Sequence, residues 1–313
     1  MLQAWKLPHL LKGLATHLPM LDKLRISRAA TGGSNSPRYC YSVWLRHLSV
    51  LALHGFCIRN AAVGELGPGD SIGTGLAALL SGAKTYVGLD LVPFSATADL
   101  LDIFQTLVQM FSEREAIPDE QEFPGIRPKL KSYVFPHHLI DSSNLALRMR
   151  CIRDQLKEPL TQGGPITYCS PWNSPAIVAA GTLDLIFSQA VLEHVDDLGE
   201  TYTAMSAWLK PGGYMSHVID FGAHHLSPFW NGHWAYTDFE WQMVRGRREF
   251  LLNREALSRH LEYAHQADLH VLEVIYRYDD AGLPLQCLAS RFQGLSSDDR
   301  RTRGTVLLLK KGA

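Results

Sequence analysis

The chain has 313 residues and a formal net charge of −1 at pH 7, and its 46% hydrophobic and 19% charged residues are typical of a globular protein. The balanced charge gives no support to a nucleic-acid partner, and no apolar run approaches the roughly 20 residues that a membrane-spanning helix needs. The five scattered cysteines contain no Cys-x-x-Cys pair, which argues against a disulfide framework and a zinc site and favours the reducing cytoplasm.

Residues 1–58 are predicted to form a helical extension that covers a cofactor. A leucine stripe with alternating spacings of four and three residues indicates an amphipathic helix, interrupted by Pro19. We expect this helix to pack on the main domain. Two alternatives stay open: binding of residues 1–30 to a membrane surface, which the basic flanks favour, and an organelle transit peptide, which the scarcity of serine disfavours. The stripe consists of Leu7, Leu11, Leu14, Leu18 and Leu21.

Residues 59–313 alternate between strand and helix patterns, which predicts an α/β domain with a mostly parallel sheet and helices on both faces. No helix separates the last two strands, so they are expected to pair antiparallel and give a seven-stranded sheet with a reversed last strand. The predicted strands are 61–66, 85–91, 165–170, 183–188, 214–220, 270–278 and 305–310. The predicted helices are 38–55, 72–81, 95–110, 198–209 and 254–266, and insertions are expected at about 117–160, 221–253 and 279–303.

The most informative motif is Glu65-Leu66-Gly67-Pro68-Gly69, at the end of the first predicted strand, with Asp90 at the end of the second. Its glycines let the backbone approach a ligand closely, and Asp90 lies where a ribose diol would bind. A dinucleotide fingerprint places its third glycine three residues after the second, whereas Gly73 follows Gly69 by four. A buried carboxylate at Glu65 would also repel a pyrophosphate. The loop therefore suits a cationic ligand better than a dinucleotide.

These segments resemble the class I S-adenosylmethionine-dependent methyltransferases over about residues 59–311. Besides the acidic-x-Gly-x-Gly loop, the resemblance includes the fourth-strand segment Leu183-Asp184-Leu185-Ile186-Phe187-Ser188 followed by Val191-Leu192-Glu193-His194-Val195. It also includes the turn Leu209-Lys210-Pro211-Gly212-Gly213 and the reversed last hairpin. The resemblance implies a Rossmann-like methyltransferase fold, S-adenosyl-L-methionine as cofactor and S-adenosyl-L-homocysteine as product.

The same resemblance implies the contacts of the cofactor. Glu65 would orient its amino group, Asp90 would accept its ribose hydroxyls, and adenine would lie near the end of the third strand. The methionine carboxylate would meet Tyr41 or Arg46, for which an aromatic helix face and a surface arginine are the alternatives. The complete expected set is Tyr41, Arg46, Glu65, Gly67, Gly69, Gly73, Asp90, Leu91, Ser170, Ser188 and Gln189.

Methylation of a hydroxyl usually needs a base, and histidine has a suitable pKa. His225 and His194 lead the candidates, followed by His224, because they follow the fifth or fourth strand at the edge where such sheets bind ligands. No metal site is predicted, because adjacent histidines rarely bind one ion together and no acid lies at helical spacing. Segment 223–241 is interpreted as a substrate lid whose acceptor contacts are Trp230, His233, Trp234 and Tyr236; the alternative is that its aromatic rings fold the insertion onto the domain.

The sequence therefore predicts O-methylation of a small molecule or glycan, with no nucleic-acid substrate. Ser188-Gln189-Ala190-Val191 stands after the fourth strand, where an Asn/Asp-Pro-Pro-Tyr segment would be the usual sign of nitrogen or nucleic-acid methylation. Three alternatives stay open: an N-methyltransferase acting on a small molecule, an NAD-linked oxidoreductase, and a methyltransferase-like scaffold subunit without activity. The sequence does not predict the acceptor's identity or the oligomeric state.

Overall fold

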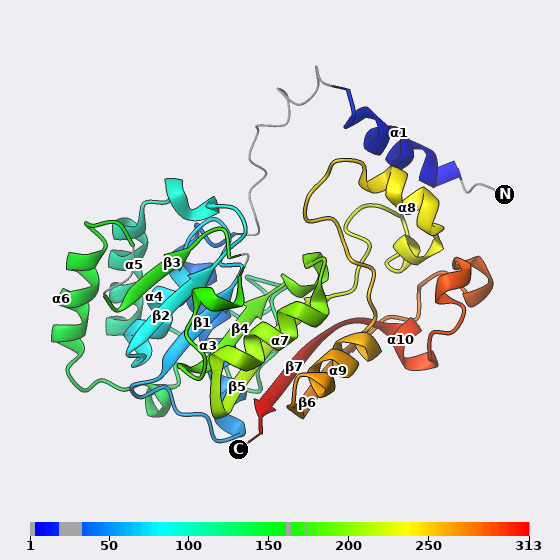
Figure 1. Ribbon diagram of the computed structural model, residues 1–313. Helices are drawn as coiled ribbons and strands as arrows, with labels where there is room; N and C mark the ends of the chain where they lie inside the picture. Colours follow the sequence, from blue (N-terminus) through cyan, green and yellow to red (C-terminus); the bar gives the residue numbers. More distant parts are fainter. Residues whose placement is uncertain (1–3, 19–32, 161–163, 173, 313) are drawn as a thin grey trace.

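The computed structural model describes residues 4–18, 33–160, 164–172 and 174–312. Its sheet has seven strands in the order β3-β2-β1-β4-β5-β7-β6 (Figure 1). All neighbouring strands run parallel except β7, which is antiparallel to both β5 and β6. The predicted Rossmann-like methyltransferase fold with a reversed last strand is therefore confirmed. The strands are β1 Ala62–Leu66, β2 Thr85–Leu89, β3 Ile166–Cys169, β4 Leu183–Gln189, β5 Leu209–Asp220, β6 Leu269–Tyr278 and β7 Thr302–Lys311.

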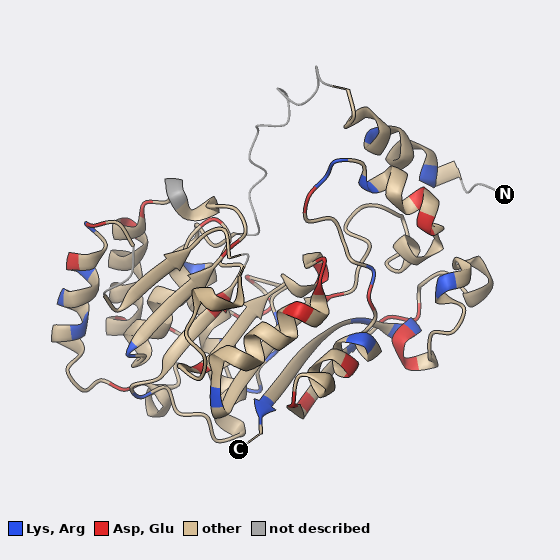
Figure 2. Ribbon diagram, in the orientation of Figure 1, with Lys and Arg blue, Asp and Glu red and all other residues tan. Residues whose placement is uncertain are grey.

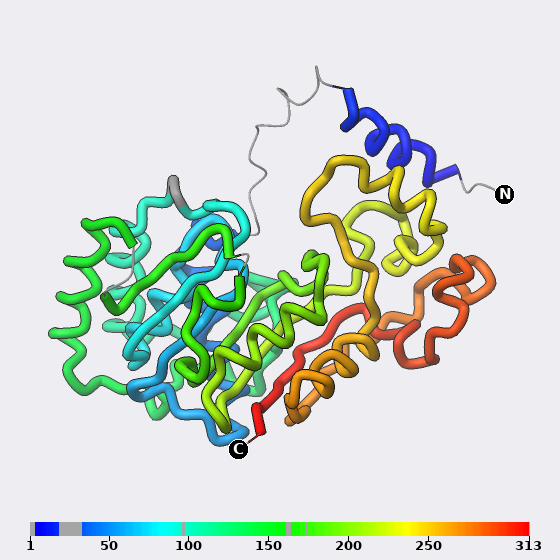
Figure 3. The backbone as a smooth tube through the Cα atoms, in the orientation of Figure 1, coloured from blue at the N-terminus to red at the C-terminus, as the bar shows by residue number. Residues whose placement is uncertain are grey.

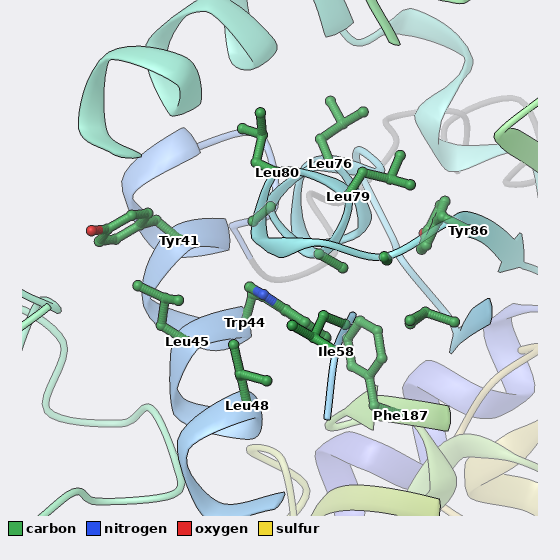
Figure 4. Close-up of a cluster of buried hydrophobic side chains, with 14 of the residues drawn as sticks. Tyr41, Trp44, Leu45, Leu48, Ile58, Leu76, Leu79, Leu80, Tyr86 and Phe187 are labelled. Carbon is green, nitrogen blue, oxygen red and sulfur yellow. The ribbon is translucent and has the colours of Figure 1, made fainter. Parts of the chain in front are cut away.

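Helices cover both faces of this sheet, and each face has its own apolar core. Trp44 and Leu48 pack with Leu76 and with Phe187 of β4 in the first core (Figure 4). Truncation of a fully buried aromatic residue costs about 3–5 kcal/mol, so this core fixes the carboxyl end of β4. The first face carries α3 (Pro37–Leu53), α4 (Gly73–Ser81) and α5 (Leu100–Glu113), and the second carries α7 (Leu198–Trp208) and α9 (Leu257–Gln266).

Two predicted boundaries differ from the structure. β5 already begins at Leu209, so the predicted turn 210–213 lies inside the strand, where the register with β4 shifts. The helix predicted from residue 95 begins at Leu100, because residues 94–97 form a separate 3-10 turn and Asp99 caps α5 by accepting from the N–H of Asp102. Side-chain capping, rather than apolar spacing, sets this helix start.

The expected insertions contain α6 (Leu145–Gln155), α8 (Asp238–Arg245) and α10 (Ser297–Arg301). Arg46 of α3 anchors the first insertion. Its fully buried guanidinium donates to the carbonyls of Pro118 and Pro128 and forms a 3.0 Å ion pair with Glu120. The insertion is thus attached to the face that carries α3.

The N-terminal leucine stripe does not pack as expected. α1 (Leu7–Ala15) lies beside α8, apart from the sheet (Figures 1 and 3), and its buried face contains Lys6, Leu10 and Gly13. A Cβ on Gly13 would lie 1.9 Å from the carbonyl oxygen of Met243, so the two helices touch along their backbones. The stripe lies on a neighbouring face and stays about half exposed at Leu7, Leu11, Leu14 and Leu18; Pro19 and Leu21 lie outside the described residues.

Charged residues of both signs are interspersed along α6, α9 and α10 (Figure 2). This distribution agrees with the net charge of −1. Among the residues that the structure describes, no helix has both the length and the apolar character required to cross a bilayer.

Candidate active site

The glycine loop follows β1 and lies against the segment that follows β4. Gly67 has a φ of +66°, and a Cβ there would lie 2.6 Å from Cγ2 of Val191. Gly69 has a φ of +73°, and its N–H donates to Oδ2 of Asp90 at 3.2 Å. A side chain at either glycine would be strained. The loop backbone therefore connects the ends of β1, β2 and β4.

Glu65 is buried between β1 and β2. The phenol of Tyr86 donates a 2.6 Å hydrogen bond to Oε2 of its carboxyl. Burial raises the pKa of Glu65 to about 8, and the hydrogen bond from Tyr86 opposes this rise only in part. A cationic group bound nearby would lower this pKa and stabilise the carboxylate.

Asp90 directly follows β2 and is only 6% exposed. Its Oδ1 accepts from the N–H of Leu91 at 3.0 Å, and its Oδ2 accepts from Gly69. Burial raises the pKa of Asp90 to about 6, and these backbone hydrogen bonds counteract the rise. The carboxyl is thus held in one orientation at the strand end, as the recognition of a ribose diol requires.

The ends of β3 and β4 complete this edge of the sheet. Ser170 follows β3, and its buried Oγ has no hydrogen-bond partner among the described residues. Gln189 ends β4, and its Oε1 lies 3.1 Å from Nε2 of His47, whose Nδ1 lies 2.7 Å from Oγ of Ser216. His47 was not a predicted site residue, because within α3 it reads as part of a helix face. Burial lowers the pKa of His47 to about 4, so its ring is neutral and orients Gln189.

A second cluster of polar side chains joins the segment after β4 to the segment after β5. One ligand-type atom each from Glu193, His194 and His224 lies within 4.8 Å of the others. Nε2 of His224 also lies 3.7 Å from Oδ2 of Asp220, the last residue of β5. The fold thus brings together two of the three predicted candidate bases. The cluster also includes the carboxyl of Glu193, from the expected fourth-strand motif, and the fold adds that of Asp220, which sequence reasoning had not placed in the site.

Comparison with protein-family models gives one match, described as "Methyltransferase domain", over residues 156–216. This segment contains β3, β4 and α7 and enters β5, so it includes the strand end that bears Gln189 and the start of the Glu193 cluster. Over this segment the chain is similar to methyltransferase domains. This match and the strand order agree with the predicted enzyme class and with S-adenosylmethionine as its methyl donor.

The solved structures that align with this chain are distant in sequence. An S-adenosylmethionine-dependent methyltransferase from Mesorhizobium loti is 13% identical over 84% of this chain and 96% of that chain, with a TM-score of 0.42. A putative sarcosine dimethylglycine methyltransferase from Galdieria sulphuraria is 14% identical over 87% and 85%, with a TM-score of 0.45. Phosphoethanolamine N-methyltransferase 2 from Haemonchus contortus is 15% identical over 94% and 59%, also with 0.45. The search of curated proteins gave no match.

Three of the expected cofactor contacts have other partners in the structure. Tyr41 is fully buried and donates to the carbonyl of Glu115, and Arg46 is held by the first insertion. Ser188 lies inside the second core, with its Oγ 2.8 Å from Nδ1 of His217. These side chains were expected at the cofactor because strand and helix positions alone do not reveal such long-range partners.

Gly73 was also an expected cofactor contact, and in the structure its absence of a side chain serves helix packing. It begins α4, and a Cβ on it would lie 2.6 Å from Sγ of Cys40 in α3. Gly73 therefore permits close packing of α4 on α3 at the loop.

The expected acceptor contacts in the lid, residues 223–241, form the interior of the insertion 221–253. The indole of Trp230 donates to the carbonyl of Asp279, the indole of Trp234 donates to that of Arg254, and the phenol of Tyr236 donates to that of Leu226. His233 is buried against Trp234. Their polar atoms face backbone carbonyls because the insertion needs its own core. The alternative interpretation, that these rings fold the insertion, fits this arrangement better than acceptor contact.

A cavity of about 390 Å³ opens beside the carboxyl ends of β4 and β5. Gln189, Ala190 and Asp220 line it on the sheet side. Arg127 and Arg277 both line the cavity. Burial and the nearby charge of Arg277 lower the pKa of Arg127. The cationic residues of the lining are Arg127, Lys129 and Arg277.

Proposed function

We propose that this methyltransferase transfers the methyl group of S-adenosylmethionine to a hydroxyl oxygen of a small molecule or glycan. The observation that supports the cofactor assignment is the pair of buried carboxyls, Glu65 and Asp90, on either side of the glycine loop. Neither forms an ion pair with a described residue, and a cationic ligand would balance their charge. S-adenosylmethionine supplies an ammonium group, a ribose diol and a methyl group on a positively charged sulfur.

The residues around the loop divide the task of binding between them. Asp90 accepts the two ribose hydroxyls, and Glu65 holds the ammonium group directly or through water. Gly67 and Gly69 bring backbone close to the ligand without side chains in the way. Gln189, fixed by His47, lies at the end of β4, where the methyl group must meet the acceptor. The site thus positions the two reactants, which is most of what an in-line displacement requires.

We place the acceptor in the cavity beside β4 and β5. Gln189 and Ala190 belong to its lining, so an acceptor there lies next to the segment that faces the donor. Arg127, Lys129 and Arg277 favour an acceptor that carries an anionic group. Asp220 connects the cavity with the histidine cluster, because it lines the cavity and lies 3.7 Å from His224.

The cluster of Glu193, His194 and His224 is where we place activation of the hydroxyl. The acceptor oxygen loses its proton there and attacks the methyl carbon, while the carbon–sulfur bond breaks and a neutral thioether leaves. His225, the other predicted base, is not among the residues whose ligand-type atoms meet in this cluster. We therefore retain His194 and His224 as the histidines of the reaction.

The cofactor assignment is tested by ligand-dependent thermal stability. A ligand that binds only the folded chain raises the melting temperature by an amount set by its concentration and dissociation constant. We expect S-adenosylhomocysteine to raise the melting temperature and NAD to leave it unchanged. Stabilisation by NAD alone would instead favour the oxidoreductase alternative.

The acceptor assignment is tested with methyl-labelled S-adenosylmethionine and a panel of phenols, monosaccharides and primary amines. We expect label in oxygen-linked products, with faster transfer to panel members that carry a carboxylate or phosphate. His224→Ala is expected to lower kcat by about 10²-fold or more while S-adenosylhomocysteine still binds. Label found only in amine products would overturn the hydroxyl assignment.

A further inference from the structure

Glu193 is a buried carboxyl with an unsatisfied oxygen. It is 2% exposed, and its Oε2 has no hydrogen-bond partner, while Oε1 accepts only a long 3.4 Å bond from the N–H of Asp220. An unpartnered polar atom in a protein interior costs about 1–3 kcal/mol. Such an atom at the carboxyl edge of the sheet, beside two histidines, points to a ligand that supplies the missing partner.

His194 is held in an orientation that leaves one nitrogen available. Its Nδ1 lies 2.7 Å from the carbonyl oxygen of Phe250, so Nδ1 carries the proton and Nε2 keeps its lone pair. A histidine that donates one ring N–H to a backbone carbonyl and presents the other nitrogen is the usual arrangement of a metal-binding imidazole.

The His224 side chain joins Glu193 and His194 because its backbone adopts an uncommon conformation. His224 and His225 have φ values of 44° and 65°, a left-handed conformation that costs about 1–2 kcal/mol for each non-glycine residue. This turn brings the His224 ring to within 5.1 Å of the His194 ring, centroid to centroid. Asp220 lies 3.7 Å from Nε2 of His224, close enough to orient the ring.

We propose that Glu193, His194 and His224 bind a divalent first-row transition-metal ion, and that this ion holds the acceptor oxygen. Two imidazoles and one carboxylate suit Zn²⁺ or Mn²⁺ and leave a coordination position open for a further oxygen. No metal site was predicted from the sequence, because adjacent histidines rarely bind one ion together and no acid lies at helical spacing from them. The fold supplies the second histidine and the carboxylate from one distant segment.

This inference rests on the proposed function and specifies how the hydroxyl is activated. An ion bound to the acceptor oxygen lowers the pKa of its hydroxyl, so the proton leaves to solvent water without a separate histidine base. The oxygen then forms the bond to the methyl carbon as the carbon–sulfur bond breaks. The products are the methyl ether, S-adenosylhomocysteine and one released proton.

The test needs no acceptor. The full chain, dialysed against EDTA, is titrated calorimetrically with Zn²⁺ and separately with Mn²⁺, and Co²⁺ is added as a spectroscopic probe of imidazole ligation. We expect one ion per chain and at least tenfold weaker binding in His224→Ala and in Glu193→Gln. His225→Ala is the matched control, because it removes the adjacent imidazole from the same strained turn; it should bind the ions as the parent does.

The outcomes test the metal site and the proposed function separately. Failure of the parent chain to bind either ion, or unchanged binding in both His224→Ala and Glu193→Gln, would overturn the metal site. Loss of binding in His137→Ala instead would assign the ions to the exposed pair His137 and His138 and would overturn the proposal as well. S-adenosylhomocysteine binding is measured on the same samples: its absence would refute the proposed function, whatever the metal result, and circular dichroism checks that each variant is folded.

Discussion

Asp90 is the residue whose substitution tests the cofactor site most directly. Asp90→Ala removes the acceptor for both ribose hydroxyls and leaves the N–H of Gly69 without its 3.2 Å partner. Hydrogen bonds to a charged group are worth about 1.5–3 kcal/mol, so we expect S-adenosylhomocysteine to bind at least tenfold more weakly. Asp90→Asn keeps one oxygen and should give an intermediate affinity. Calorimetric titration measures all three dissociation constants; equal values would refute this role of Asp90.

Glu65 predicts a pH dependence of cofactor binding. Its pKa is about 8 in the free protein because the carboxyl is buried, and an ammonium group beside it would favour the carboxylate. Binding should therefore release a proton, and affinity for S-adenosylhomocysteine should rise by roughly tenfold or more between about pH 6 and pH 8. Titration in buffers of different ionisation enthalpy measures the released proton. Glu65→Gln cannot release it and should show a flatter profile, whereas a steep profile in that variant would assign the proton to another group.

The predictable part of the site consists of residues whose role follows from their place in the chain. Glu65 and Asp90 end adjacent parallel strands, so their proximity follows from the strand pattern alone. Glu193 and His224 come from segments 31 residues apart and meet only because β4 and β5 pair and a left-handed turn follows. No local pattern marks that turn, because positive φ is uncommon for any non-glycine residue, even for histidine, which adopts it more often than most. The buried partners of Ser188, Tyr41 and Arg46 depend in the same way on packing between distant segments.

Among the elements, α1 shows how periodicity can identify a helix and still select the wrong face. The leucine stripe predicted the helix correctly, but contact with α8 is made by Leu10 and Gly13. Backbone approach at a glycine, rather than the largest apolar side chains, determines this docking. The strands were more predictable, because each contains a short apolar run, and β1, β2 and β5 end at or directly before a glycine or an acidic residue.

Docking of α1 can be tested with two neighbouring leucines. Leu10 is 6% exposed and Leu11 is 57% exposed. Leu10→Ala should weaken the α1–α8 contact by about 2–3 kcal/mol, because it removes buried apolar surface and leaves a cavity. We expect faster amide hydrogen exchange throughout residues 7–15 in Leu10→Ala and parent-like exchange in Leu11→Ala. Faster exchange in Leu11→Ala alone would mean that the stripe, not the Leu10 face, holds the helix.

On the scale of the whole molecule, buried titratable groups set a pH at which the fold is most stable. Four histidines are buried, and burial lowers the pKa of His47 to about 4 and the pKa values of His217, His233 and His260 to about 3. They stay neutral in the folded chain, whereas unfolded histidines take up protons below about pH 6.5. Glu65 and Glu193 act in the opposite sense, because burial raises both pKa values to about 8 and the folded chain keeps protons that the unfolded chain has released.

The balance of these groups changes sign near pH 6.5. Between about pH 4.5 and 6 the unfolded chain binds four histidine protons, whereas the folded chain binds two glutamate protons and one on Asp90, whose pKa burial raises to about 6, so stability rises with pH. From about pH 6.5 to 8 the two glutamate protons dominate the difference, so stability falls, by about 1.4 kcal/mol per pH unit for each proton. We expect the melting temperature in EDTA-containing buffer to peak near pH 6.5. Glu65→Gln should show about half of the decline above the peak, because Glu193 remains, and should keep the decline below it, because the histidines remain; a melting temperature that rises from pH 6.5 to pH 8 in the parent chain would show that another group outweighs the two glutamates.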